Sequence, residues 1–166
     1  MDVELGDGEH DIQVDYYQGV GDSYLDLWWE VIDPARFPNW RGEYFPNKTL
    51  SGRPVLIRND SAIDFDWRDG SPDPALSADG FSVRWTRQVD IPEDESGNYR
   101  FTLQADDGVR LWVDDELAMD RWTPTPGSTE EKLIYLTEGN HDLRVEYYED
   151  GGLAQVRLAW EYLPLP

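Results

Sequence analysis

The residues best suited to chemistry are two adjacent aspartates, Asp106 and Asp107, which are followed by Gly108 between two stretches of β-type alternation. Successive side chains on an extended strand point to opposite faces, so both carboxylates can reach one object only where the backbone leaves strand geometry. Two neighbouring anions also repel each other unless a cation lies between them. The pair therefore indicates a site for a hard cation. The alternative is a plain acidic turn, because Asp and Gly are common turn residues.

A period of two dominates the second half of the chain, as expected for half-buried β-strands. Apolar residues alternate with polar ones in five runs: residues 81–91, 99–105, 109–113, 143–147 and 156–160. Segments rich in Asp, Gly and Pro separate these runs, and no window has the apolar spacing of a helix. The pattern predicts an all-β fold, a sandwich or barrel, rather than alternating strands and helices.

The composition is that of one folded domain with a strongly acidic surface. The 166 residues are enough for one well-buried core, and the 13% aromatic content argues against a disordered acidic chain. With a formal net charge of -21, we expect no nucleic-acid partner, because such partners need a basic surface. No run is as long as a membrane span, so no membrane insertion is expected. The sequence has no signal peptide, so any export signal would lie outside it. There is also no cysteine, so disulfide bonds and thiolate metal sites are excluded.

The chain also contains an internal repeat. Shifting the sequence by 131 positions aligns residues 5–30 with residues 136–161 at 11 identities, where composition alone would give roughly one or two. Residues 1–33 are therefore predicted to be a β-hairpin that resembles the carboxy-terminal end of a preceding repeat. The complete unit is predicted to occupy residues 35–166.

A lone hairpin is only marginally stable in water, so residues 1–33 are expected to dock on another surface. Two alternatives remain open. The hairpin packs on the edge of its own domain, or it adds strands to another copy of the chain and builds a fibre. Size measurements that stay monomeric at high concentration would count against the second alternative.

Seven segments of the chain resemble the protective-antigen-14 domain family, named for the amino-terminal part of the anthrax toxin protective antigen. They follow the family's order and are residues 40–45, 50–54, 63–67, 81–85, 97–101, 106–114 and 139–148. The resemblance implies an antiparallel β-sandwich with jelly-roll character, which agrees with the strand pattern. Members are found in adhesins, toxins, glycosidases and other secreted or surface proteins, so fold membership alone leaves the function open.

In carbohydrate-binding members of this family, an adjacent acid pair joined by a cis peptide holds calcium, which in turn coordinates sugar hydroxyls. The resemblance puts Asp106 and Asp107 at those positions and implies Ca2+ as the cofactor and a glycan as the partner. A second ligand loop follows the strand that ends near Tyr148. The residues expected to supply it are Glu149, Asp150, Gly151, Gly152 and Leu153, with Asp150 as the preferred side-chain ligand of the metal.

Other polar and aromatic candidates are expected to be mainly structural. Asp114, Asp115 and Glu116 are predicted to form a hairpin turn with solvated charges. Trp122 lies ahead of a Pro-rich loop and has two interpretations, stacking on a sugar ring or partial burial. The further structural assignments are His10 and His141 as repeated fold elements, Trp85, Trp112 and Trp160 as core, and Arg84 and Arg110 as partners of nearby acids.

The sequence does not predict an enzyme. Glycosidase chemistry needs two carboxyl groups about 5–10 Å apart across the scissile bond, and no nucleophile elbow, phosphate loop or His metal motif is present. We therefore predict a calcium-dependent carbohydrate-binding, lectin-like module of a secreted or cell-surface protein. The alternative is a structural module of an extracellular multi-repeat assembly, in which residues 1–33 dock on a neighbouring copy.

Overall fold

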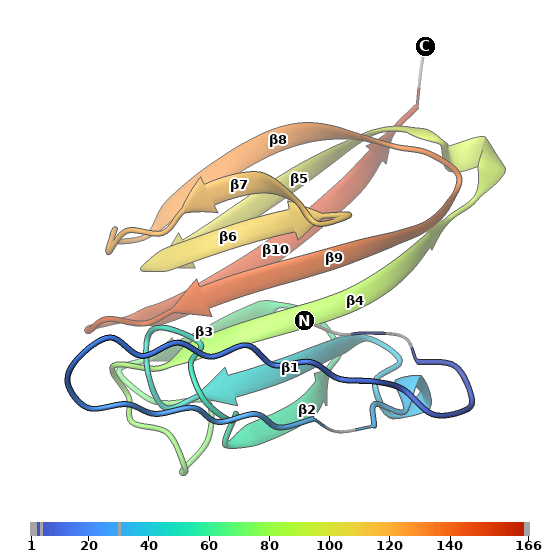
Figure 1. Ribbon diagram of the computed structural model, residues 1–166. Helices are drawn as coiled ribbons and strands as arrows, with labels where there is room; N and C mark the ends of the chain where they lie inside the picture. Colours follow the sequence, from blue (N-terminus) through green and yellow to red (C-terminus); the bar gives the residue numbers. More distant parts are fainter. Residues whose placement is uncertain (1–2, 4, 30, 165–166) are drawn as a thin grey trace. The chain divides into compact units, whose positions relative to one another are not determined.

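The computed structural model describes residues 3, 5–29 and 31–164 (Figure 1). The chain divides into two units, Met1–Val31 and Ile32–Pro166. None of the helices in the described residues has the length and apolar sequence that a membrane crossing requires. In chain order the elements are η1 (Pro34–Arg36), β1 (Trp40–Phe45), β2 (Leu56–Asp60), β3 (Asp64–Arg68), β4 (Ser82–Ile91), η2 (Glu93–Glu95), β5 (Gly97–Asp106), β6 (Gly108–Val113), β7 (Glu116–Arg121), β8 (Ser128–Leu136), β9 (Gly139–Tyr148) and β10 (Ala154–Leu163).

The strands of the second unit form two antiparallel sheets. One sheet has the strand order β2-β1-β4-β9-β6-β7, and the other has the order β3-β10-β5-β8. Inner-face side chains of both sheets join in one hydrophobic core, so the sheets are the two layers of a β-sandwich. The predicted all-β antiparallel sandwich is confirmed.

The core follows from alternation along the inner strands. Val83 and Trp85 on β4, Phe101 on β5 and Tyr147 on β9 are fully buried, while intervening residues of these strands are more exposed. Trp160 packs against this core from a partly buried position. Burying one such side chain stabilises the fold by about 1.5–3 kcal/mol, so the period of two decides which face of each strand turns inward.

All five predicted runs are strands, namely β4, β5, β6, β9 and β10. The strands without a predicted counterpart are β1 and the four sheet edges, β2, β3, β7 and β8. β1 is buried along its whole length, so it lacks a simple alternation of apolar and polar residues. Edge strands carry charged and polar residues that discourage pairing with other chains, and these residues obscure the period of two.

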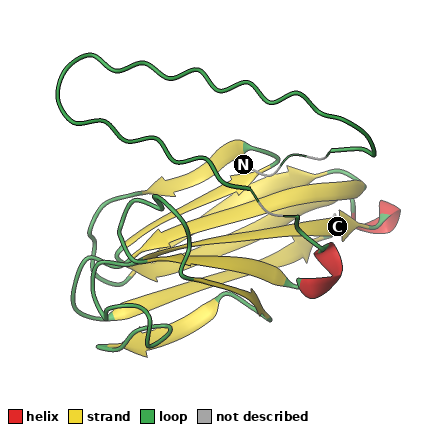
Figure 2. Cartoon of the chain, turned by 60° about the horizontal axis from the view of Figure 1, so that its bottom comes forward, coloured by secondary structure: helices red, strands yellow, loops and turns green. Residues whose placement is uncertain are grey.

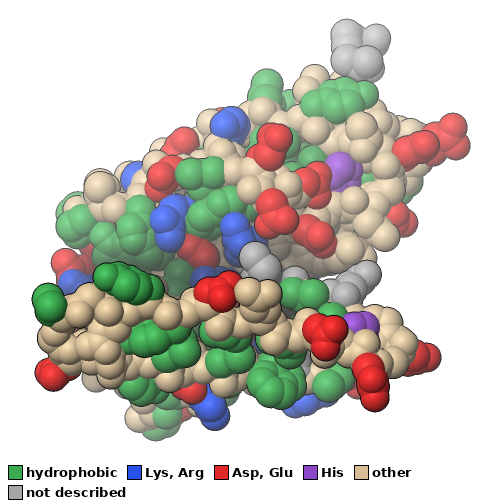
Figure 3. Space-filling view, viewed as in Figure 1, with side chains coloured by type: hydrophobic (Ala, Val, Ile, Leu, Met, Phe, Trp, Pro, Cys, Tyr) green, Lys and Arg blue, Asp and Glu red, His purple; other side chains and the backbone are tan. Residues whose placement is uncertain are grey.

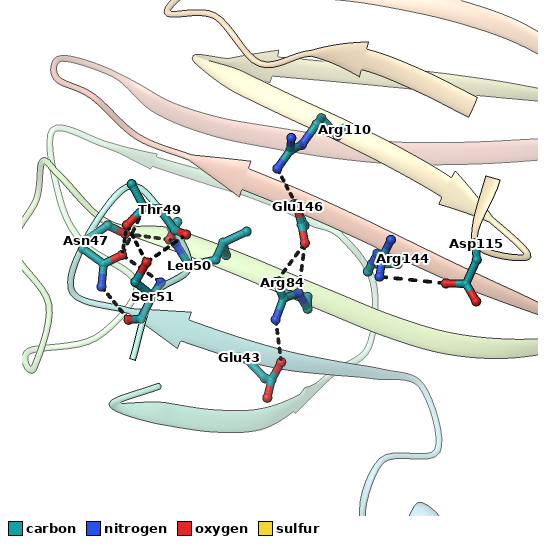
Figure 4. A network of polar contacts seen from close by, with 11 residues as sticks. Glu43, Asn47, Thr49, Leu50, Ser51, Arg84, Arg110, Asp115, Arg144 and Glu146 are labelled. Atoms are coloured by element: carbon teal, nitrogen blue, oxygen red, sulfur yellow. Dashed lines mark hydrogen bonds and ion pairs between the residues drawn. The ribbon is translucent and has the colours of Figure 1, made fainter. Parts of the chain in front are cut away.

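A row of ion pairs crosses the outward face of the six-stranded sheet (Figure 4). Glu146 Oε1 lies 2.9 Å from Arg84 Nη2, and Glu146 Oε2 lies 2.8 Å from Arg110 Nη2. Arg84 Nη1 also lies 3.9 Å from Glu43 Oε2. The prediction that Arg84 and Arg110 pair with nearby acids is confirmed. The row connects four neighbouring strands, β1, β4, β9 and β6.

The prediction that Trp112 belongs to the core is wrong. The odd-numbered residues of β6 are buried, so Trp112 is out of phase with them and lies on the outward face. There its ring lies between two guanidinium groups, with Arg110 Cζ 4.9 Å and Arg144 Cζ 4.4 Å from the ring centroid. Cation–π attraction therefore takes the place of core packing at this position.

The unit formed by residues 1–31 contains no strand among its described residues (Figure 2). Its chain runs out and back as an extended loop, with a hydrogen bond from the Gln18 amide to the Gly21 carbonyl at the reversal. Hydrophobic side chains project along the face of this segment that Figure 3 shows. The hairpin predicted over residues 1–33 thus has no β-ladder in the described residues, which exclude residues 1, 2, 4 and 30. Two strands alone cannot bury such side chains.

The connection between β6 and β7 is the predicted hairpin turn. Asp114 and Asp115 both have positive φ, 51° and 63°, as a type I′ turn requires. The Asp114 carboxylate is not simply solvated, because its Oδ2 lies 2.6 Å from Nδ1 of buried His141, and its Oδ1 accepts the Asp142 N–H at 2.9 Å. Nε2 of His141 lies 3.0 Å from the Thr137 carbonyl oxygen. Only the protonated imidazolium can donate to both partners at once.

This contact makes stability depend on pH. Burial lowers the pKa of His141, but the hydrogen bonds to Asp114 and to the Thr137 carbonyl outweigh it, so the pKa is raised above 6.5. The added stability is complete below about pH 6.5 and is lost as the pH rises through the raised folded-state pKa. We expect Asp114→Asn to lower the free energy of unfolding by about 1–2 kcal/mol at pH 5.5 and by less at alkaline pH, as measured by urea denaturation. Asp115→Asn is the control and should show no such dependence, and equal losses at both pH values for Asp114→Asn would contradict the account.

Candidate cation and ligand site

Three connections that cross from one sheet to the other meet at one end of the sandwich. They are residues 69–81 between β3 and β4, Asp107 between β5 and β6, and residues 149–153 between β9 and β10. Strand register holds them together. Gly108 and Ser82 both pair with Tyr148, from opposite sides of β9. Asp106 pairs with Gln155 on β10. The acid pair and the loop assigned to one site from the sequence are therefore neighbours in the structure.

The acid pair lies at the centre of this end. A cis peptide bond joins Asp106 to Asp107, as the family resemblance implied. Asp107 is buried, and its Oδ2 accepts hydrogen bonds from the backbone N–H groups of Asp150 at 2.7 Å and Gly151 at 3.4 Å. The Asp106 side chain is half-buried. The Asp107 carboxylate thus fixes the position of the 149–153 loop.

Glu149 is the loop residue whose burial the sequence did not reveal. Its side chain is fully buried, its Oε2 accepts the Tyr147 hydroxyl at 2.8 Å, and its Oε1 has no hydrogen-bond partner in the described part of the chain. The same hydroxyl lies 2.6 Å from the Asp106 carbonyl oxygen. A hydroxyl has one hydrogen, so Tyr147 cannot donate fully to both oxygens at the same time. The Glu149 carboxyl is therefore incompletely satisfied.

Negative charge accumulates around this carboxyl. Burial is the main cause that raises the pKa of Glu149 to about 7. The hydrogen bond from Tyr147 lowers the pKa, while the charges of Asp107, Asp106 and Asp79 raise it further. Carboxyl groups from all three sheet-crossing connections thus act on one region, which favours binding of a cation there.

The connection between β3 and β4 holds the loop from the other side. Glu149 donates its N–H to the Phe81 carbonyl at 2.9 Å and accepts the Gly80 N–H at its own carbonyl at 3.0 Å. Asp79 Oδ1 accepts the Gly152 N–H at 3.3 Å. Sequence reasoning missed Asp79, because no local pattern brings residue 79 to a loop more than seventy positions later.

Asp150, the metal ligand preferred from the sequence, lies at the exposed side of the loop. Its Oδ1 forms an ion pair with Lys48 Nζ. Lys48 belongs to a turn closed by Asn47, whose Oδ1 accepts the backbone N–H groups of Thr49 at 3.0 Å and Ser51 at 3.1 Å (Figure 4). The side chain of Asp150 is therefore engaged by a cation of the protein itself.

The phase of β9 separates the two loop acids. Val145 and Tyr147 are fully buried, and Glu149 continues their period of two. Asp150 is out of phase with these positions and is exposed. This phase was the signal in the sequence that could have distinguished the buried acid from the exposed one.

The rest of the loop forms an exposed rim. Gly151, Gly152 and Leu153 are all exposed. Gly152 has a φ of 105°, a conformation that L side chains rarely adopt. The loop therefore turns with little side-chain bulk next to Asp107.

Trp122 lies beside the site and is half-buried, as one of its two interpretations predicted. Its ring meets the Tyr148 ring edge-on at a centroid distance of 4.7 Å, and Arg110 Cζ lies 3.9 Å from its centroid. Tyr148 in turn packs on Gly108, where an added Cβ would lie 1.9 Å from the tyrosine Cε1. Only a glycine at position 108 lets the Tyr148 ring pack this closely beside the acid pair.

The donor set suits a hard cation held by mixed oxygen ligands. Among the described residues, no group of three or more His, Cys, Asp or Glu side chains is arranged to hold a metal ion. The site instead offers two adjacent carboxylates, a partnerless buried carboxyl oxygen and the backbone carbonyls of a glycine-containing loop. Calcium accepts such mixtures of carboxylate, carbonyl and water oxygens.

The close packing at Gly108 gives a first prediction for this end. We expect Gly108→Ala to lower the free energy of unfolding by about 2–3 kcal/mol, because the new methyl group overlaps Tyr148. Guanidinium denaturation measures the loss. Gly151→Ala is the matched control, since a Cβ there meets nothing within 4 Å, and it should change stability by less than about 0.5 kcal/mol. Equal stability of the two variants would show that the packing is not tight.

The raised pKa of Glu149 gives a second prediction. A carboxyl with a folded-state pKa of about 7, above its ordinary 4.5, favours folding when protonated, so the stability of metal-free protein falls as the pH rises from about 4.5 to about 7. Glu149→Gln should remove this fall and stabilise the chelator-treated protein at pH 8 by about 1–3 kcal/mol. Denaturation at pH 5 and pH 8 measures the effect, with Asp150→Asn as the control that keeps the fall. Persistence of the fall in Glu149→Gln would exclude this carboxyl as its source.

Known proteins share this architecture. The family model of the PA14 domain matches residues 39–164. The chain is 41% identical over 121 residues to the anti-sigma-I factor RsgI3 of Acetivibrio thermocellus, which covers 72% of the chain and 18% of that relative. The chain therefore spans less than a fifth of the curated protein that it matches.

Solved structures agree. An anti-sigma factor domain-containing protein has a TM-score of 0.68 at 40% identity, covering 75% of this chain and 43% of that one. A PA14 sugar-binding domain from an RTX adhesin has a TM-score of 0.53 at 20% identity, covering 74% of this chain and 89% of that one, which shows a common fold. By its sequence and its fold, the chain belongs to the PA14 domain family.

Proposed function

We propose that this chain is a calcium-dependent glycan-binding module in which Asp106 and Asp107 hold the ion. The observation that carries the proposal is the meeting of this acid pair with the 149–153 loop, beside a buried carboxyl oxygen that lacks a hydrogen-bond partner among the described residues. Carboxylates crowded in this way repel one another in the metal-free protein. A bound divalent cation would relieve that repulsion.

Each acidic residue would have a distinct task. The carboxylates of Asp106 and Asp107 would bind the ion, and Asp107 also fixes the loop through its hydrogen bond from the Asp150 N–H. Glu149 would add negative charge from the interior. Asp150 is paired with Lys48, so we assign it a secondary part at the rim. Calcium would supply coordination positions at which vicinal sugar hydroxyls can replace water.

The rim of the site suits a sugar ring. Leu153 is 60% exposed and offers an apolar side chain, while Gly151 and Gly152 leave room for a ligand to approach the loop backbone. Trp122 adds a partly exposed ring held by Tyr148 and Arg110. Apolar and aromatic surface beside a hydroxyl-binding cation matches the amphipathic character of a pyranose.

The relatives support the proposal at different levels. A member of the same fold is described as a sugar-binding domain of an adhesin, but at 20% identity this likeness transfers the fold and not the ligand. The 41% identity with an anti-sigma-I factor supports a parent protein that regulates a sigma factor, in which this module would be the ligand-binding part. We place the module outside the cell or at its surface, where free glycans and millimolar calcium are found, and propose no catalytic role for it.

Isothermal titration calorimetry tests the proposal in two steps. Calcium is first titrated into chelator-treated protein, and a panel of mono- and disaccharides is then titrated with and without calcium. We expect one calcium site with a Kd on the order of 10⁻⁴ M and sugar heat only when calcium is present. The double variant Asp106→Asn with Asp107→Asn should weaken calcium binding by at least about 10-fold and abolish the sugar heat.

The matched control is Glu93→Gln with Asp94→Asn, which removes two adjacent exposed acids from η2 at the other end of the sandwich. It should bind calcium and sugar like the unaltered protein. Sugar heat without calcium would exclude the ion's role, and unchanged calcium binding by the Asp106 and Asp107 variant would exclude the site. Oligomers that survive chelation, without any sugar heat, would favour the structural-module alternative.

A further inference from the structure

The repeat seen in the sequence is also present in the backbone. Gly8 and Gly139 correspond at the 131-residue offset, and both have positive φ, 128° and 103°. Gly21 and Gly152 correspond in the same way, with φ of 97° and 105°. Gly139 begins β9, and Gly152 lies in the loop between β9 and β10. Gly8 and Gly21 are at the corresponding positions of the amino-terminal segment. The two segments therefore have glycines of positive φ at corresponding positions, in addition to their 11 identical residues.

A side-chain contact recurs at the same offset. His141 Nε2 lies 3.0 Å from the carbonyl oxygen of Thr137, four residues earlier. His10 Nε2 lies 2.7 Å from the carbonyl oxygen of Gly6, also four residues earlier. The structural role predicted for both histidines from the repeat agrees with this common contact.

The core positions of the last two strands keep their apolar character in residues 5–30 but not their burial. Val145 and Tyr147 are fully buried, whereas their counterparts Val14 and Tyr16 are 46% and 50% exposed. The other exposed counterparts of core residues are Ile12, Leu25 and Leu27, for Leu143, Val156 and Leu158. The segment therefore has the inner face of a sandwich without the rest of the sandwich.

The topology explains why the described residues of the segment form no β-ladder. β9 lies between β4 and β6 in one sheet, and β10 lies between β3 and β5 in the other. These consecutive strands do not pair with each other. Their counterparts, residues 8–17 and 23–32, therefore have no reason to form a hairpin, and each needs two flanking strands of its own.

We propose that residues 5–30 are the closing strands of a second PA14-type sandwich, completed by counterparts of β1 to β8 that precede this sequence in the parent protein. The partner surface thus consists of two vacant strand positions, one in each sheet of the preceding domain, and we call these positions slots. Each slot is flanked by two strands, as β9 and β10 are here. The apolar side chains of the segment are the missing part of that domain's core. Burial of the five side chains that correspond to core residues would contribute about 1.5–3 kcal/mol each.

A second copy of this chain is a poorer partner than a preceding domain. Its own β9 and β10 already fill both slots. A sheet edge offers backbone hydrogen bonds on one side only, whereas both parts of the segment correspond to interior strands. One alternative from the sequence was that residues 1–33 dock on another copy of the chain. A second copy is therefore a less favoured partner than a preceding domain.

The loops of the two copies would differ in charge. Gln18 and Gly19 take the places of Glu149 and Asp150, while Asp22 takes the place of Leu153, so the preceding loop has one carboxyl group where this loop has two. A glutamine oxygen can still accept a hydrogen bond but carries no charge. On the proposed calcium function, the preceding site would hold a cation with less help from its loop.

Hydrogen exchange measured by mass spectrometry tests the proposal. In the 166-residue chain, the amides of residues 10–17 and 23–29 should exchange almost as fast as in an unfolded peptide. In an extended chain, in which a duplicate of residues 35–135 is joined directly to Leu5, the same amides should exchange at least about 100-fold more slowly, as one cooperative unit. Val14→Asp in the extended chain should abolish this protection, whereas Gln13→Asp, which changes the adjacent outward position, should not.

A second extended chain shows whether any leading copy can fold in this setting. It consists of residues 35–161 joined directly to residues 31–166, so that the leading copy is closed by its own last strands. If this chain protects its leading copy and the chain closed by residues 5–30 does not, the proposal is wrong. Protection of residues 10–17 already in a monomeric 166-residue chain, or only in concentration-dependent oligomers, would also overturn it.

Discussion

The rest of the structure depends on one constraint, the register in which β9 pairs with β4 and β6 and in which β10 pairs with β3 and β5. β9 and β10 are interior strands of different sheets, so the loop between them must cross the sandwich. Tyr148 pairs with Gly108, and Gln155 pairs with Asp106, so both ends of that loop are held next to the acid pair. A slip of one residue in either strand would turn every inward side chain outward. Core burial therefore fixes the position of the site.

The site gathers charge that the fold by itself does not favour. Glu149 occupies an inward position in phase with Tyr147, yet it is a carboxyl with one oxygen that lacks a partner in the described structure. Its raised pKa reflects burial and the neighbouring aspartates. A carboxyl buried in this way lowers the stability of the protein at neutral pH, and on the proposed function it would add negative charge to a cation site. The conflict between local stability and charge is typical of functional sites.

Several features could be predicted from the sequence because they depend on local pattern. The period of two identified the interior strands, and the resemblance identified the acid pair and its loop. The edge strands β2, β3, β7 and β8 were missed because exposure on the edge mixes polar and apolar residues. Trp112 and Glu149 depend on strand phase, which is visible only once the strand limits are known. Asp79 could not be predicted, because only tertiary structure brings it to the loop. The repeat was visible in the sequence, but not that its two strands belong to opposite sheets.

The central claim is that Asp106 and Asp107 hold a divalent cation beside the 149–153 loop. The most direct measurement is an anomalous difference map from crystals of the protein grown with calcium, collected at a wavelength where calcium scatters anomalously. The account predicts one peak at about 2.3–2.6 Å from carboxylate oxygens of both aspartates and from at least one oxygen of the loop. A map that shows calcium only at other positions, or only water beside Asp106 and Asp107, would contradict it.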